Sequence, residues 1–373
     1  MWFDQLTFYL FLFLVVWLIA YMLGEKFGLK RYGVEIFPLV FILRTKKVNK
    51  VLEFTAKKMG RVIPTIANIF IVLSVGLMVF GAYTLTKNLF HLFYRVEKAI
   101  PIFPAVPMVT VRASLPYFLV SVAIIILVHE FAHGIVASYE KIKVKSAGFM
   151  FLAIIPGGFV EPDEESFKKA ELTKKLRVLA AGSSANLVFG LIVIILLATL
   201  FPPSGVLIQG VVKDSPADRV GLQPGDVIKA VYGKPTPNLQ VFREIMGSVR
   251  VGETVDLKVE FRNGTIATLN VKTVSAPENR SRAIIGIYPT DYIKITPLYL
   301  TFFWVQLWSI SIAIVNMLPI YPLDGGSFVY YLLEKYLKKR YAKILGAVIS
   351  AIFISLLGLN IALTFLRFGF ISI

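Results

Sequence analysis

Residues 116–138 read PYFLVSVAIIILVHEFAHGIVAS, and this stretch decides the fold. As a helix it can cross the hydrocarbon core of a bilayer, which is roughly 30 Å thick and takes about 20 residues. The run nevertheless holds His129, Glu130 and His133 in the pattern H-E-x-x-H. Ionisable side chains inside a membrane are costly unless they are paired or bind a metal. The sequence therefore predicts a membrane helix that carries a functional site.

The spacing of the two histidines favours a metal site. Positions i and i+4 share a helix face, so His129 and His133 can reach one Zn²⁺, with Glu130 as general base toward the attacking water. The chain has three histidines and no cysteine, so a third ligand should be a carboxylate at matching depth. Asp324 stands in an apolar stretch whose prolines and glycines predict a broken helix. An interfacial aspartate at a helix end is the alternative interpretation of Asp324.

The whole composition agrees with a membrane protein. Hydrophobic residues make up 56% and charged residues 17% of the 373 positions, and the mean hydropathy is +0.71. These values exclude an ordinary soluble globule, because soluble domains carry about 25% charged residues. Apolar runs long enough to span the bilayer predict six transmembrane helices, near residues 5–23, 64–86, 116–138, 178–200, 298–318 and 344–366.

The net charge of +17 also indicates membrane topology rather than nucleic-acid binding. The basic residues concentrate in loops beside apolar runs, above all in 24–61 and 333–343, and such loops stay on the cytoplasmic side. We therefore expect a multi-pass protein of the cell membrane with both termini and residues 201–297 outside the cytoplasm. The metal site should lie within the bilayer, nearer its cytoplasmic face, and no nucleic-acid partner is expected.

Residues 201–297 differ from the rest of the chain. They contain short β-branched stretches separated by Gly, Asp and Pro, and an Asn263-Gly264 pair that is typical of a hairpin turn. They predict a small soluble α+β domain. The expected organisation is an N-terminal membrane region (1–115), the first half of the core (116–200), this domain (201–297), the second half of the core (298–343) and a last transmembrane helix (344–373).

Taken together, these motifs resemble the site-2 proteases, which are intramembrane zinc metalloproteases. His129 to His133 match the first motif of the family, and Asn316 to Gly325 (NMLPIYPLDG) match its N-x-x-P-x-x-x-x-D-G motif. The resemblance implies one zinc ion per chain, held by His129, His133 and Asp324, with Glu130 as catalytic base. It also implies transmembrane proteins as substrates, cleaved within or near their membrane segments.

The resemblance extends to further elements of the core. The family has a membrane-associated β-hairpin after the metal helix, and residues 148–160 fit it, with Pro156, Gly157 and Gly158 as the bend and the glycines as substrate contacts; a re-entrant loop is the alternative. Asn186 and Asn316 are expected to contact the substrate or the oxyanion, or else to join helices. Ser183 stands where the family often has proline.

The outer domain resembles a PDZ domain. The residues that carry this resemblance are 210–217 (GVVKDSPA), 220–228 (VGLQPGDVI) and 231–234 (VYGK). PDZ domains bind an extended peptide at a sheet edge, so the domain is expected to bind a peptide tail of a substrate or to exclude intact ectodomains. A simple spacer is the alternative. Two other functions stay open from the sequence: a zinc transporter or sensor that is not a protease, and a PDZ scaffold with a degenerate protease core.

Overall fold

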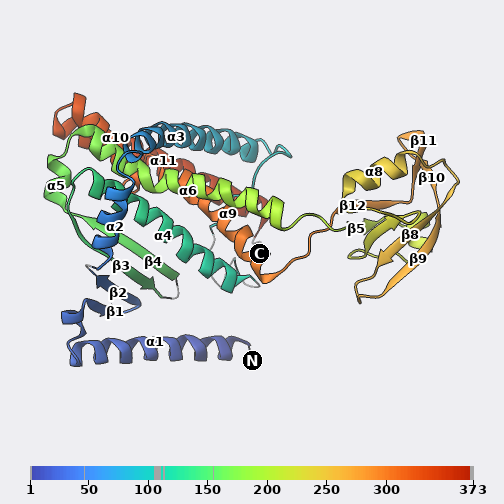
Figure 1. Ribbon diagram of the computed structural model, residues 1–373, viewed down its shortest axis with the longest axis horizontal. Coiled ribbons are helices and arrows are strands. Elements are labelled where there is room, and N and C mark those ends of the chain that lie inside the picture. The colour runs from blue at the N-terminus through green and yellow to red at the C-terminus, as the bar shows by residue number, and fades with distance from the viewer. Residues whose placement is uncertain (1, 46, 105–110, 112–113, 154, 370–373) are drawn as a thin grey trace. The chain divides into compact units, whose positions relative to one another are not determined.

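The computed structural model describes residues 2–45, 47–104, 111, 114–153 and 155–369, with side chains from residue 13 onward (Figure 1). The chain divides into two compact units, one formed by residues up to Ile194 together with those from Leu300, the other by Ile195–Tyr299. The first unit contains the long helices and the predicted metal ligands. The second is a small domain rich in strands.

Five helices among the described residues are long and apolar enough to cross a membrane: α3 (Ile63–Phe93), α4 (Leu115–Tyr139), α6 (Leu172–Leu200), α9 (Pro297–Asn316) and α11 (Lys339–Phe368). Each contains or closely matches one of the expected spans. The first expected span lies in α1 (Trp2–Lys26), and its passage through the membrane stays a prediction. The shorter helices of this unit are η1 (Leu29–Tyr32), α2 (Lys47–Lys58), α5 (Glu164–Lys169) and α10 (Asp324–Tyr336).

Small residues let the long helices approach one another closely. A Cβ added at Gly190 on α6 would lie 2.8 Å from Ile310 on α9. On the α3 side of α6, the hydroxyls of Ser74 and Ser184 are 3.0 Å apart. Helix pairs in membranes associate through such small residues and polar contacts. As a result α6 packs between α3 and α9, where its backbone can take part in the site.

The predicted hairpin is part of a larger antiparallel sheet. β1 (Val34–Phe37), β2 (Val40–Thr45), β3 (Val144–Leu152) and β4 (Ile155–Pro162) follow one another in that order. The predicted bend was wrong, because the chain reverses between Leu152 and Ile155, and Pro156, Gly157 and Gly158 lie within β4. Proline is tolerated there because β4 ends the sheet and needs no N–H on its outer side.

The second unit has the predicted α+β character. Its main sheet contains β5 (Val206–Val211), β6 (Val227–Val231), β8 (Thr254–Glu260), β9 (Ile266–Lys272) and β12 (Ile287–Asp291), in the order β12-β5-β6-β8-β9. The short β7 (Lys234–Pro235) pairs with β6, and β10 (Val274–Ala276) pairs with β11 (Asn279–Ile284). The predicted Asn-Gly hairpin joins β8 to β9. Two helices, α7 (Pro216–Arg219) and α8 (Leu239–Gly247), complete the unit, and α8 contributes Phe242 and Met246 to its core.

Candidate metal centre

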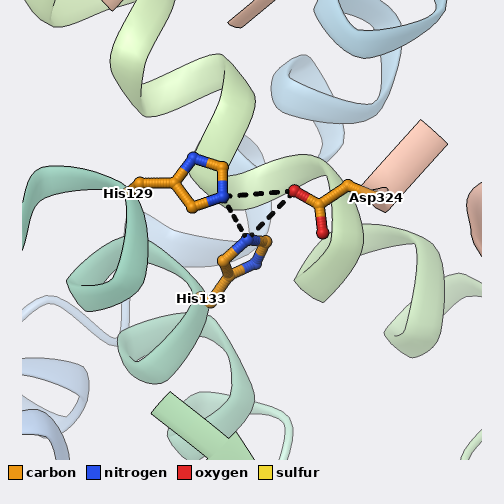
Figure 2. Close-up of side chains that lie close together, drawn as sticks. All are labelled: His129, His133 and Asp324. Carbon is orange, nitrogen blue, oxygen red and sulfur yellow. Dashed lines mark hydrogen bonds and ion pairs between the residues drawn. The ribbon is translucent and has the colours of Figure 1, made fainter. Parts of the chain in front are cut away.

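The three predicted ligands meet at one point. His129 and His133 lie one turn apart on α4, and their Nε2 atoms are 3.0 Å from each other. Oδ2 of Asp324 is 3.3 Å from Nε2 of His129 and 3.2 Å from Nε2 of His133. Figure 2 shows the two rings and the carboxylate pointing toward one another. Residues distant in sequence thus form a compact set of two nitrogen donors and one oxygen donor.

This arrangement fits a tetrahedral zinc site. Ligands that lie 2.0–2.1 Å from a tetrahedral ion are about 3.3–3.4 Å from one another. The three donor distances, 3.0 to 3.3 Å, approach that spacing on every side of the triangle. Two imidazoles, one carboxylate and an open fourth position are also a donor set of catalytic zinc sites.

Gly182 on α6 keeps space beside the donors. A Cβ at this position would lie 2.6 Å from Nε2 of His129 and closer still to Nε2 of His133. A methyl group there would occupy the space next to the Nε2 atoms of both histidines. Only the fold shows this steric role of Gly182.

Asp324 reaches the histidines because the chain turns sharply after α9. That helix ends at Asn316, and Asp324 is the first residue of α10. The two glycines that follow allow α10 to begin directly against the connecting segment. A Cβ at Gly325 would clash with the carbonyl groups of Met317 and Leu318, and one at Gly326 would lie 2.5 Å from the nitrogen of Tyr321. The helix break expected from the prolines and glycines is therefore confirmed.

Hydrogen bonds hold both rings. Nδ1 of His133 is 2.6 Å from the carbonyl oxygen of Val178, so it carries the proton and leaves Nε2 free to bind a metal. Nδ1 of His129 is 3.2 Å from the side-chain amide of Asn186. Asn186 is fully buried, and its Oδ1 has no partner among the described residues. With that amide turned over, Oδ1 accepts the Nδ1 proton of His129, which again leaves Nε2 as the ligand.

Asn316 also lies at the ligands. Its Nδ2 is 3.1 Å from Nε2 of His129 and donates to Oδ2 of Asp324 at 3.2 Å. Asn186 and Asn316 were expected to contact the substrate or the oxyanion. The structure places both asparagines against the metal donors, and their contact with a substrate stays a prediction.

Glu130 links α4 to the sheet. Its Oε2 accepts a hydrogen bond from the N–H of Val160 on β4 at 2.8 Å. Glu130 and His129 line two adjoining cavities of about 420 and 330 Å³. The larger cavity is also bordered by α5, whose first turn is capped by Asp163. The N–H of Ser166 donates to this carboxylate and holds the pKa of Asp163 below its usual value.

Gly157 and Gly158 line the smaller cavity together with His129 and Glu130. A Cβ at Gly157 would lie 2.6 Å from the side chain of Met150, and one at Gly158 would lie 3.1 Å from Ile126. The predicted contact of these glycines with a substrate stays a prediction. The sequence did not indicate Val160 or Val178, because each acts through a backbone group.

Comparison with known proteins identifies the family. The model of peptidase family M50 matches residues 117–359. The chain belongs to this family. A further relative, "Uncharacterized protein MJ0971" of Methanocaldococcus jannaschii, is 31% identical over 355 residues, which cover 90% of this chain and 89% of the relative.

Two further matches cover parts of the chain. "Zinc metalloprotease RasP" of Geobacillus kaustophilus is 22% identical over 254 residues, or 52% of this chain and 58% of the relative. The PDZ domain of an SdrC-like protein from Listeria innocua is 26% identical, covers 24% of this chain and 96% of that domain, and has a TM-score of 0.22. This M50 peptidase is thus a multi-pass membrane metalloendopeptidase of the site-2 type, and its family implies zinc. The predicted family and enzyme class are confirmed.

Proposed function

We propose that this M50 peptidase hydrolyses peptide bonds within or near the transmembrane segments of other membrane proteins. One observation carries the proposal: the donors His129 and His133 and the base Glu130 lie on α4, a helix long and apolar enough to cross a membrane. A peptide bond that reaches these residues has to come from a chain that is itself in or next to the bilayer. Transmembrane proteins are therefore the substrate class that the site favours.

His129, His133 and Asp324 would hold the zinc ion. Zinc, when bound, polarises the scissile carbonyl and lowers the pKa of a water molecule at the site. Glu130 takes the proton of the attacking water and passes it to the leaving amine. The amide of Asn316, next to His129 and Asp324, supplies a hydrogen-bond donor beside the reacting carbonyl.

A transmembrane substrate must lose helical structure before it is cleaved, because helical hydrogen bonds bury its peptide groups. An extended segment can replace those bonds with pairing to a sheet edge. β4 is the terminal strand of the sheet and contacts Glu130 through Val160. These features favour β4 as the strand that receives the unwound substrate.

The basic loops support an orientation for the enzyme. They favour a cytoplasmic position for residues 24–61 and 333–343, with both termini and the PDZ-like domain (201–297) outside and the metal centre nearer the cytoplasmic face. Within the PDZ-like domain, β12 lies at one end of its sheet. An extended peptide tail of a substrate can pair there.

The test uses full-length protein in detergent with a single-span peptide that contains helix-weakening residues. Wild type and Glu130→Gln are compared for zinc per chain and for cleavage. We expect about one zinc in both and cleavage by the wild type alone. Cleavage of a water-soluble peptide but of no single-span peptide would contradict the substrate class. Absence of zinc from both proteins would contradict the ligand assignment.

A further inference from the structure

One side of β4 has no strand partner among the residues that the structure describes. The N–H of Val160 points to this side of the strand, because it donates to Glu130 on α4. Backbone groups point alternately to the two sides of an antiparallel strand. Pro156, Gly158 and Pro162 therefore share the outward side with Val160.

This outward edge is short and has a defined pattern of donors. Proline has no N–H, so Pro156 and Pro162 each offer only a carbonyl oxygen. Gly158 and Val160, between them, are the two positions with both an N–H and a carbonyl oxygen. A strand added to this edge finds full hydrogen-bonded pairs at these two residues alone.

The edge also runs past the metal centre. Pro156 and Gly158 line the cavity of about 330 Å³, whereas Val160 and Pro162 line the cavity of about 420 Å³. His129 and Glu130 line both cavities. An extended peptide on the outward edge of β4 would pass directly in front of the donors and the base.

We propose that the substrate backbone pairs with β4 in one register, fixed by the N–H groups of Gly158 and Val160, and that it takes over the Val160 N–H now bound by Glu130. This inference rests on the proposed function. The N–H of Val160 has two acceptors, the carboxylate before binding and a substrate carbonyl afterwards. The exchange frees Oε2 of Glu130 when a peptide lies across the centre, which couples the availability of the base to the presence of substrate.

The first test scans the substrate. In a cleavable single-span peptide, each backbone amide around the scissile bond is replaced in turn by an ester, which removes one N–H. We expect kcat/KM to fall about two- to tenfold at every second substrate residue that lies opposite β4, the effect of losing one hydrogen bond to a β4 carbonyl. Residues in between should not show this loss. Esters also weaken the substrate helix, but that effect has no period of two.

The outcomes separate the two proposals. A flat or smoothly varying scan, with the unmodified peptide cleaved by the wild type and not by Glu130→Gln, overturns the register and leaves the proposed function standing. Failure of the wild type to cleave the unmodified peptide overturns the proposed function, and the register falls with it. The alternate pattern supports both.

The second test changes the enzyme. Val160→Pro removes the shared N–H at a position two residues before a natural proline, so β4 should tolerate it. Val160→Ala keeps the N–H and removes most of the side chain. With equal zinc contents, the proline variant should have a kcat/KM about tenfold below that of the alanine variant. Equal activity of the two variants would overturn the role of Val160. If Val160→Pro loses zinc, the peptide scan decides.

Discussion

Replacing Gly182 with alanine tests whether the backbone of α6 reserves the space for the metal. The added Cβ would lie 2.6 Å from both Nε2 and Cε1 of His129 and closer still to Nε2 of His133. Both nitrogens are donors to the proposed ion. The methyl group and the ion would therefore compete for the same space beside the two Nε2 atoms. The helix itself should tolerate the change, because alanine has a higher helix propensity than glycine.

The size of the effect follows from the distances. Opening a 2.6 Å contact to an ordinary 3.4 Å contact requires a displacement of about 0.8 Å. A metal site tolerates deviations of only about 0.2 Å in its ligand distances. In metalloproteins generally, removing a residue that hydrogen-bonds a metal ligand weakens metal binding about 10- to 100-fold. Displacing the ligands themselves should weaken zinc binding at least about 100-fold, which corresponds to about 2.7 kcal/mol of binding free energy.

The assay is zinc affinity of the full-length protein, measured by competition with a chromophoric chelator, together with zinc per purified chain. Gly190→Ala is the matched control, because it adds a methyl group to the same helix, 2.8 Å from Ile310 and away from the donors. It should cost some stability through overpacking but leave zinc affinity unchanged. If Gly182→Ala binds zinc as tightly as the control does, the steric reasoning is refuted.

Three further substitutions and the removal of zinc test the centre and its supports. Asn186→Ala should weaken zinc binding about 10- to 100-fold by releasing His129, and an unchanged chelator competition would show that Asn186 only fills space. Gly325→Ala should lower both zinc content and the thermal midpoint, because the methyl group meets the Met317 and Leu318 carbonyls at a cost of about 1–3 kcal/mol; normal zinc content would contradict this. Removing zinc should lower the midpoint, since free zinc at 100 times its Kd stabilises by about 2.7 kcal/mol. Asp324→Ala should abolish that response, and a response equal to that of the wild type would exclude Asp324 as a ligand.

Much of the core could be predicted because its signals are local. The long apolar runs identified the five described membrane-length helices, and the i, i+4 spacing placed His129 and His133 on one face. Asp324 was a candidate from its depth in a broken apolar stretch and from the lack of cysteine, and the resemblance of its motif to that of the site-2 proteases favoured it over an interfacial aspartate. In each case residues within one turn or one segment determine the property, so a single sequence contains the information.

The bend of the hairpin was predicted wrongly for a physical reason. Proline and glycine commonly mark turns, and Pro156, Gly157 and Gly158 looked like one. In the fold they form part of β4, because a terminal strand does not need the N–H that proline lacks. Ala153, the first residue after β3 in the actual reversal, has a positive φ of 55°. The neighbouring sequence does not predict this left-handed conformation.

Other parts of the site depend on contacts between distant segments and could not be predicted. The roles of Gly182, Val178 and Asn186 arise because α6 packs directly against α4, and helix packing is not encoded by the pattern of either helix alone. Each of these residues limits where an imidazole can lie: Val178 and Asn186 hold the two Nδ1 atoms, and Gly182 leaves the space beside the Nε2 atoms. Since the rings are already oriented by α6, an incoming ion needs little rearrangement of α4. Helix α6 supplies none of the three proposed ligands. Changes in its residues that hold the imidazoles should nevertheless weaken metal binding about 10- to 100-fold, as the loss of a residue that hydrogen-bonds a metal ligand does in other proteins.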